Sequence, residues 1–396
     1  MRSEFAVDTD WVVSKDLFAV WLNPTLSSAH SLQLWLVSNT SFADVSVSVA
    51  GYHTREVKRQ GGAGPPFATQ YELIPTSSST KVIFAKRDVA LRICNGRKGG
   101  QQTRGNGHCK TLMAKTVIAN GSKSSWVWRD MRKWNSQWEA LFSIWVQHLF
   151  RPLPSERNRG WHRLHDVLRN PERNFLYNQL GYVEDDPNST NRIRAKADCG
   201  DLPYMLRAYF SWKFSLPFRY SECTRGTGQK GPRCMNEVDN RNIRHESISH
   251  PVARFNAFLK VVSYKVHSGT YRTLPVSDTS DFYPVALSRD TIRPGTVFVD
   301  PGGHVLLVSQ WDADGLYAVD GHPDKTVTRR PFKPKFFPHY PRLTTGGFKA
   351  FRPFRRRNEH WIPVPNSQLK STFSRMQYRF QTPNEFYQRV GELMIH

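Results

Sequence analysis

The sequence predicts an α+β fold, with helical segments first and an antiparallel group of strands after them. Apolar side chains recur at helical spacing in several stretches between residues 134 and 266. Short apolar runs separated by turn residues follow between residues 297 and 322. Helices and strands that are segregated along the chain in this way are typical of α+β domains.

Size and charge limit the class of protein. The chain has 396 residues, enough for one large domain with additions or for two domains. Its net charge of +23 would attract polyanions such as nucleic acid, teichoic-type polymers or acidic membrane surfaces. The alternative interpretation is that the basic side chains only face solvent and bind no specific partner. No run of about 18 apolar residues is present, which predicts that the chain has no membrane span.

The start of the chain gives an expectation about location. Acidic side chains occur at Glu4, Asp8 and Asp10, and no apolar stretch of the kind that a secretory signal requires accompanies them. The default expectation is therefore a cytoplasmic protein. A cell-envelope protein is the expectation if the true start differs from Met1.

Composition changes along the chain and indicates a division near residue 125. The stretch from Arg55 to Lys123 is rich in Gly, Ser, Lys and Arg, and the sequence predicts a weakly ordered basic extension over residues 1–125. Two alternating apolar runs, at 32–36 and 45–49, indicate two short strands in it. Residues 126–396 are expected to form a single α+β domain. Its parts would be N-terminal helices over 126–196, a core over 197–322 with a helical insertion at 218–285, and a wrapping C-terminal segment over 323–396.

Apolar stripes predict the helices of this domain. The first helix should end before Pro152 and Pro154, and the third should be closed by Gly181. One helix falls in the insertion, and a short one lies near the C-terminus. The marker residues are Trp134, Trp138, Leu141, Trp145 and Leu149; Trp161, Leu164 and Leu168; 172–180; Phe255, Leu259, Val262 and Val266; and Phe386, Val390 and Leu393.

Cys199 precedes a further helix, which two interleaved apolar stripes predict to be buried on most sides. N–H groups at a helix start lack partners and favour negative charge, so a thiolate there would be stabilised and nucleophilic. Pro203 favours a helix start nearer Asp201, with Cys199 on the entering turn. Asp198 and Asp201 are candidate supporting residues. A small packing residue is the other interpretation of this cysteine.

The strands after the insertion predict an antiparallel meander in which His304 opens the middle strand. Asp320 ends the next strand and would lie beside His304 if the pairing is regular. Its carboxylate would then orient the imidazole and stabilise its charged form. In the alternative interpretation Asp320 caps the following turn, and His322 becomes the candidate third residue.

The order of cysteine, histidine and polar third residue resembles the NlpC/P60 group of papain-like cysteine peptidases and amidases. The similar motifs within residues 197–322 are Asp198-Cys199-Gly200, Pro294-Gly295-Thr296-Val297 and Gly303-His304-Val305. The resemblance implies a papain-like core, in which the cysteine-bearing helix packs on a small antiparallel sheet. It also implies hydrolysis of a peptide, peptidoglycan-stem or small amide bond, without a cofactor. The long insertion between cysteine and histidine, and an aspartate as third residue, depart from that group's pattern.

The insertion contains Cys223 and Cys234. These two residues form a bridge in an oxidising compartment or remain free thiols elsewhere. Because insertions near an active site often shape substrate access, this segment is a candidate lid. A surface elaboration is the alternative.

Three other functions stay open. One is a non-catalytic binding or structural protein on the same fold. Another is a polyanion-binding or nucleic-acid-binding protein that uses residues 325–357, where basic residues and phenylalanines alternate without any Asp or Glu. The last is a metal site made from Cys199, His304, Asp320 and His322. Because these four follow no standard zinc spacing, the sequence predicts no metal.

Overall fold

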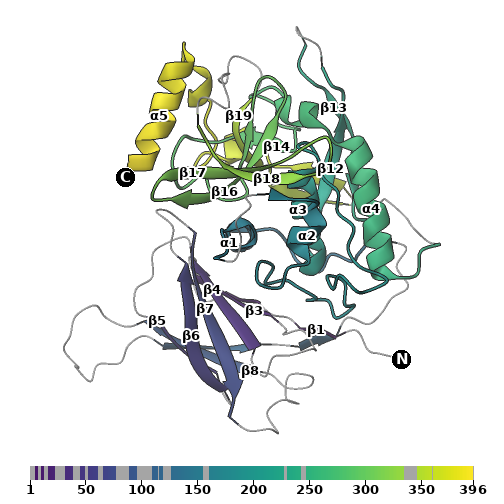
Figure 1. Cartoon of the computed structure of the whole chain (residues 1–396), viewed down its shortest axis with the longest axis vertical. Coiled ribbons are helices and arrows are strands. Elements are labelled where there is room, and N and C mark those ends of the chain that lie inside the picture. Colours follow the sequence, from purple (N-terminus) through teal and green to yellow (C-terminus); the bar gives the residue numbers. More distant parts are fainter. Residues whose placement is uncertain are drawn as a thin grey trace. The chain divides into compact units, whose positions relative to one another are not determined.

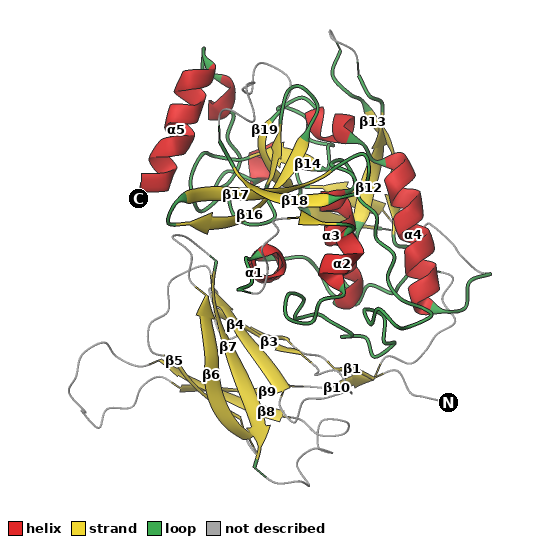
Figure 2. Ribbon diagram, viewed as in Figure 1, coloured by secondary structure: helices red, strands yellow, loops and turns green. Residues whose placement is uncertain are grey.

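The computed structural model describes residues 126–154, 160–226, 230–241, 247–333, 346–358 and 360–395, together with the strands between Phe5 and Ile118 and a few flanking residues. The chain forms two compact units. Antiparallel sheets and few helices make up the described part, which is compatible with the predicted α+β class (Figures 1 and 2). The first unit comprises Met1–Lys123, Ser136–Ile144 and Asn178–Gly181, and the second comprises Ser124–Asn135, Trp145–Tyr177 and Tyr182–His396.

The first unit is built on an eight-stranded antiparallel sheet (Figure 2). Its strands pair in the order β2-β3-β4-β7-β6-β5-β8-β9, and β1 pairs with β10 in a separate ribbon. The strands are β1 Phe5–Val7, β2 Asp10–Val12, β3 Leu17–Leu22, β4 Leu32–Ser38, β5 Val45–Val49, β6 Tyr52–Gln60, β7 Phe67–Pro75, β8 Val89–Asn95, β9 Cys109–Ala114 and β10 Thr116–Ile118.

The sequence predicted a weakly ordered extension with two short strands over this part of the chain. The two strands read from the sequence are present as β4 and β5, but other strands accompany them. The other strands include charged, exposed side chains that do not produce an alternating apolar pattern. On β6, for example, Arg55 is exposed and forms an ion pair with Glu72 on β7. Strands of this kind depend on cross-strand pairing more than on their own apolar pattern.

The second unit contains a seven-stranded antiparallel sheet with the order β11-β18-β17-β16-β15-β19-β14 (Figure 1). The predicted meander is present as β15, β16 and β17. Two small sheets, β12-β13 and β20-β21, complete the unit. The strands are β11 Gly160–Trp161, β12 Arg219–Cys223, β13 Cys234–Asp239, β14 Phe282–Pro284, β15 Val297–Val299, β16 Val305–Asp312, β17 Gly315–Gly321, β18 Val327–Pro331, β19 Gly347–Phe351, β20 Phe354–Arg357 and β21 His360–Pro363.

The C-terminal segment, which the sequence predicted to wrap the domain, contributes strands to this sheet. β18 pairs with β17, and β19 lies between β15 and β14. The pairing of β19 with β15 joins residues that are far apart in sequence, so no local pattern reveals it. Residues 334–345 of the basic run lie outside the described residues.

The helices agree with most of the apolar stripes. Trp134 precedes the first helix, which begins at Ser136, and Val266 is the C-cap of the helix that ends at Lys265. Trp161 lies in β11, and residues 172–180 form turns, because Asn178 adopts a positive φ of 52° that an α-helix does not tolerate. No helix in the described ranges combines the length and hydropathy needed to cross a bilayer. The helices are α1 Ser136–Phe150, α2 Leu164–Leu168, α3 Leu202–Lys213, α4 Pro251–Lys265 and α5 Pro383–Ile395, with 3₁₀ turns η2 Ser268–Arg272, η4 Asn366–Gln368 and η5 Met376–Tyr378.

Helix α3 is buried along its whole length, as its two apolar stripes predict. Its cationic side chains Lys213 and Arg207 have partners within the protein. Lys213 forms ion pairs with Glu184 and Asp185, and the Arg207 guanidinium lies 3.2 Å from the ring centre of Trp134. Since an unpaired buried charge is costly, these contacts allow the helix to be enclosed on all sides.

Helix α5 packs its apolar face against the seven-stranded sheet. Phe386 is fully buried there, and its ring lies 6.2 Å from that of Phe298 on β15 and 6.3 Å from that of Phe348 on β19, measured between ring centres. Tyr387 and Val390 belong to the same core cluster. The helix therefore closes one side of the core that lies against the sheet.

Replacing Phe386 with alanine should lower the free energy of unfolding by about 3–5 kcal/mol, because it leaves a cavity in this core. Urea denaturation would measure the change. Gln388→Ala, at an exposed position of the same helix, should change the free energy by less than about 0.5 kcal/mol. Equally small effects of both substitutions would contradict the packing of α5 on the sheet.

Candidate active site

Cys199 lies in a turn that two carboxylates shape. Oδ1 of Asp198 accepts hydrogen bonds from the N–H groups of Gly200 at 2.9 Å and Asp201 at 3.1 Å. In return, Oδ2 of Asp201 accepts one from the N–H of Asp198 at 3.3 Å. The Asp198 carbonyl accepts the N–H of Leu202 at 3.0 Å. This reciprocal pattern is a capping box, with Asp198 as the N-cap and Cys199 as the first residue of the helical turn that leads into α3.

The capping box leaves the backbone N–H of Cys199 unused. The Asp198 side chain accepts the N–H groups of Gly200 and Asp201, which follow Cys199. Among the described residues, the N–H of Cys199 itself donates to no protein acceptor. Regular helix begins at Leu202, near the start that Pro203 predicts, and the hydrogen bonds extend the turn back to Asp198. Free N–H groups at such a position favour negative charge on the nearby thiol.

Other backbone segments approach this turn closely from two directions. A Cβ atom on Gly200 would lie 2.9 Å from the Cα of His267, at the start of η2. A Cβ atom on Gly321, at the end of β17, would lie 2.6 Å from the carbonyl oxygen of Asp198. The hydroxyl of Tyr271 donates to the Gly200 carbonyl at 2.6 Å. The predicted insertion therefore contributes η2 to one side of the Cys199 turn, and β17 supports the other.

His304 lies just before β16 and has two partners. Its Nε2 lies 2.8 Å from Oδ2 of Asp320, which leaves Nδ1 for the interaction with the thiol of Cys199. Burial lowers the pKa of His304, but hydrogen bonds with Asp320 and Cys199 outweigh this effect and raise the pKa to about 9. The imidazole is therefore protonated at neutral pH and provides a positive charge beside the thiol.

Asp320 is fully buried, and its carboxylate is held by several groups. Oδ2 also contacts Arg330 at 2.9 Å, and Oδ1 accepts the hydroxyl of Thr328 at 2.5 Å. The register of β17 and β18 places Asp320 opposite Thr328. Burial raises the pKa of Asp320, but the hydrogen bonds with His304 and Thr328 and the charge of Arg330 hold the pKa below its usual value. Asp320 is thus a carboxylate that orients His304.

His322, the alternative third residue, does not hydrogen bond with His304. Its Nε2 lies 3.0 Å from the hydroxyl oxygen of Thr328 and 3.6 Å from Oδ1 of Asp320. The structure therefore brings Cys199, His304 and Asp320 together and places His322 at the edge of the group.

The sequence analysis did not identify Thr328 and Arg330 as part of this site. Both act only through Asp320, on the strand paired with it, and a pairing register cannot be read from a single strand. One signal was available. A buried carboxylate needs several donors, and β18, the next strand along the chain, is rich in Thr and Arg.

Cysteine chemistry also singles out Cys199. Cys223 and Cys234 face each other across β12 and β13 and form a disulfide, which resolves the two alternatives left by the sequence. Cys94 is disulfide-bonded as well, whereas Cys199 is free and partly exposed. In the described ranges, no group of three or more His, Cys, Asp or Glu side chains has a metal-binding arrangement.

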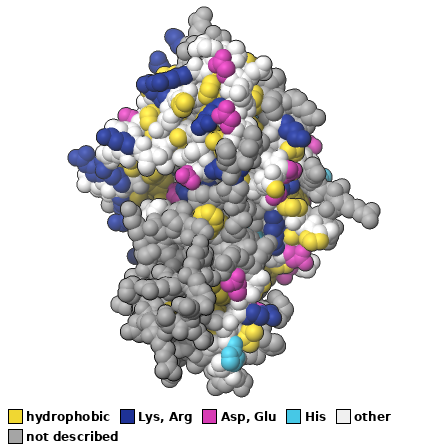
Figure 3. All heavy atoms as spheres, turned by 90° about the vertical axis from the view of Figure 1, so that its left-hand side faces the viewer, with side chains coloured by type: hydrophobic (Ala, Val, Ile, Leu, Met, Phe, Trp, Pro, Cys, Tyr) yellow, Lys and Arg dark blue, Asp and Glu magenta, His cyan; other side chains and the backbone are white. Residues whose placement is uncertain are grey.

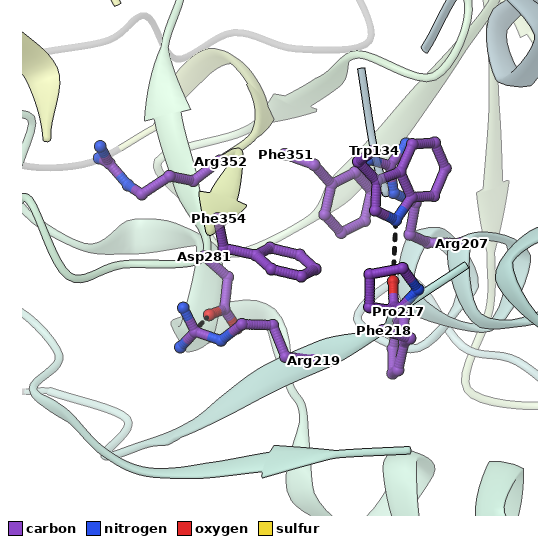
Figure 4. A pocket seen from close by; sticks show the side chains of 9 residues that line it. All are labelled: Trp134, Arg207, Pro217, Phe218, Arg219, Asp281, Phe351, Arg352 and Phe354. Carbon is purple, nitrogen blue, oxygen red and sulfur yellow. Dashed lines mark hydrogen bonds and ion pairs between the residues drawn. The ribbon is translucent and has the colours of Figure 1, made fainter. Parts of the chain in front are cut away.

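A small pocket elsewhere in the second unit is lined by aromatic and arginine side chains (Figure 4). Its acidic residue, Asp281, already accepts hydrogen bonds from the hydroxyl of Tyr204 and from the N–H and hydroxyl of Ser221, each at 2.7 Å. Arg352 donates to several carbonyl groups. Because Asp281 and Arg352 already have hydrogen-bond partners around the pocket, their contacts support the fold.

The basic run 325–357 is divided among different elements. Lys325 lies in the turn between β17 and β18, whereas Arg355, Arg356 and Arg357 are exposed on β20. On the face of the second unit seen in Figure 3, lysine and arginine side chains form separate groups, with acidic and hydrophobic side chains between them. The described lysine and arginine side chains on this face therefore form no continuous basic track.

Comparisons of the chain with protein-family models, with curated proteins and with solved structures find no match.

The pairing of His304 can be tested by NMR titration. Its imidazole should titrate near pH 9, and Asp320→Asn should lower the midpoint, because the carboxylate favours the charged ring. Since the folded-state pKa exceeds the ordinary 6.5, the pairing stabilises the fold fully below pH 6.5, and this contribution is lost as pH rises through about 9. His304→Gln identifies the resonance. A midpoint at or below 6.5 would contradict the pairing.

Proposed function

We propose that the protein is a thiol hydrolase that cleaves an amide bond through Cys199, His304 and Asp320. The observation that carries the proposal is the chain of contacts from the thiol through the imidazole to the buried carboxylate. Such an arrangement activates a thiol, since the imidazole accepts its proton and the carboxylate fixes the ring. The substrate class is a peptide or peptidoglycan-stem amide, as the resemblance of the motifs implies.

The proposed reaction follows from these positions. Because His304 is protonated at neutral pH, its ring already holds the proton that leaves Cys199, and the Cys199 thiolate sulfur attacks the carbonyl carbon of the amide. The N–H of Cys199, which the capping box leaves unused, donates to the resulting oxyanion. His304 then gives the proton to the leaving amine as the C–N bond breaks. Water, deprotonated by His304, hydrolyses the thioester and regenerates the thiol.

We also propose that the second unit has a papain-like core. In support, the turn that leads from Asp198 into α3 lies against the end of β17. His304 directly precedes β16, and Asp320 lies on β17, which pairs with β16 in the antiparallel sheet. The insertion between cysteine and histidine contains the disulfide-linked strands β12 and β13, helix α4 and η2.

A screen of amide substrates with matched variants tests the function. Cys199→Ala and His304→Gln should each abolish turnover. Asp320→Asn is nearly isosteric and should lower turnover by up to about 10⁴-fold, because the amide sets the wrong imidazole tautomer and lacks the counter-charge. His360→Gln, at an exposed position of β21, is the control and should have parental turnover.

The same screen includes the double variant Cys199→Ala/His304→Gln. Residues that act as one unit give non-additive losses, so the double variant should be little worse than either single variant. Parental activity of Cys199→Ala on every cleaved substrate would refute the hydrolase. In that case, retention on nucleic acid that weakens with salt would favour the polyanion-binding alternative.

A further inference from the structure

Lys325 occupies an unusual backbone conformation in the turn between β17 and β18. Its φ is +69°, a left-handed conformation in which glycine or asparagine is usually found. The turn is closed by hydrogen bonds from the N–H of Lys325 to the His322 carbonyl at 2.8 Å and from the N–H of His322 to the Thr326 carbonyl at 2.9 Å. A lysine held in this conformation prompts the question of what its side chain does.

The ammonium group of Lys325 reaches the capping box of the Cys199 turn. Its Nζ lies 2.9 Å from Oδ2 of Asp198 and 3.4 Å from Oδ2 of Asp201. One cation therefore contacts both carboxylates that shape the turn, from a residue more than 100 positions further along the chain. The lysine side chain is about one-third exposed, so solvent reaches this contact.

The two carboxylates have a specific need for this cation. Asp201 is buried, and its Oδ1 has no hydrogen-bond partner among the described residues. Burial and the nearby Asp198 raise the pKa of Asp201 to about 7, and Lys325 opposes this rise. Without the cation, two adjacent acids would stand beside a thiol that must itself become negative during the proposed reaction.

We infer that Lys325 is a positioning residue for the nucleophile, because it holds the Asp198–Asp201 capping box and thereby the place and charge of the Cys199 turn. The inference rests on the proposed function and concerns how the Cys199 turn of that site is held in place. Lys325 touches neither substrate nor reacting atoms in this scheme, and acts through the two carboxylates.

Lys325 belongs to the same β17–β18 hairpin that carries Asp320 and Thr328. The strand that carries Asp320 runs into the turn that carries Lys325, and β18 returns with Thr328. The same hairpin therefore orients His304 at one point and the Cys199 turn at another. Gly321, between these points, lets the strand lie against the Asp198 backbone.

Three substitutions separate the ammonium group from the backbone conformation. Lys325→Gln removes the charge and keeps the left-handed strain. Lys325→Gly removes the charge and relieves the strain, so it should fold at least as well as the parent. Lys325→Arg keeps a cation. The first readout is the rate of Cys199 alkylation by iodoacetamide in the folded protein, which requires no substrate, and the second is kcat and KM on a cleaved amide.

Lys325→Gln and Lys325→Gly should each lower the alkylation rate and kcat by about tenfold or more, with KM changed less, because the nucleophile is misplaced. Lys325→Arg should lie closer to the parent than either. Lys196→Gln, which removes an exposed lysine close to the same turn in sequence, is the charge-matched control and should leave both readouts unchanged.

Parental alkylation and kcat in Lys325→Gly would overturn the inference, and so would an equal loss in Lys196→Gln. Melting curves and circular dichroism show whether each variant is folded, and the glycine and arginine variants decide if the glutamine variant is not. If Cys199→Ala still hydrolyses the amide, the proposed function fails, while the alkylation rates still decide the role of Lys325.

Discussion

The buried carboxylate of Asp320 is the constraint on which the site depends. An ionised carboxylate without contact to water is costly unless several donors surround it. His304, Thr328 and Arg330 supply those donors. The requirement to satisfy this one group fixes the imidazole ring, the register of β17 with β18 and the position of an arginine at the edge of the site.

The carboxylate in turn governs the chemistry of the thiol. Because Asp320 binds Nε2 of His304, the ring presents Nδ1 to Cys199 and carries its proton at neutral pH. The Cys199 turn is ordered separately by the capping box of Asp198 and Asp201. Asp320 thus acts on the thiol through His304, whereas Asp198 and Asp201 shape the turn that carries it. The β17–β18 hairpin contributes to both, through Asp320 and Lys325.

Local sequence was sufficient where a feature depends on neighbouring residues. The apolar stripes that begin at Leu202 predicted a helix buried on most sides, and turn residues around His304 predicted the meander. These patterns also placed His304 and Asp320 on adjacent strands. The pairing of β16 and β17 has an irregularity between Val308 and Gln310, which no sequence pattern indicated, yet Asp320 still reaches the imidazole.

Features that depend on distant pairing could not be predicted in the same way. β19 enters the sheet between β15 and β14, so Lys349 is buried, and its ammonium donates to the carbonyls of Tyr271 and Thr273. The basic run that contains it gave the opposite expectation of a surface segment. Similarly, nothing near Lys325 in sequence indicates that its side chain reaches Asp198.

The distinction between a catalytic group and a structural network lies in what remains unsatisfied. In the pocket of Figure 4, Asp281 and Arg352 have partners within the protein. At Cys199, the carboxylate of Asp320 and the imidazole of His304 are bound. The thiol, however, is free and partly exposed, and the N–H beside it has no described acceptor. A nucleophile and a donor left available next to a charged, oriented imidazole are the two groups that attack on a carbonyl requires. The thiol and this N–H therefore remain available at the site, in contrast to Asp281 and Arg352 in the pocket.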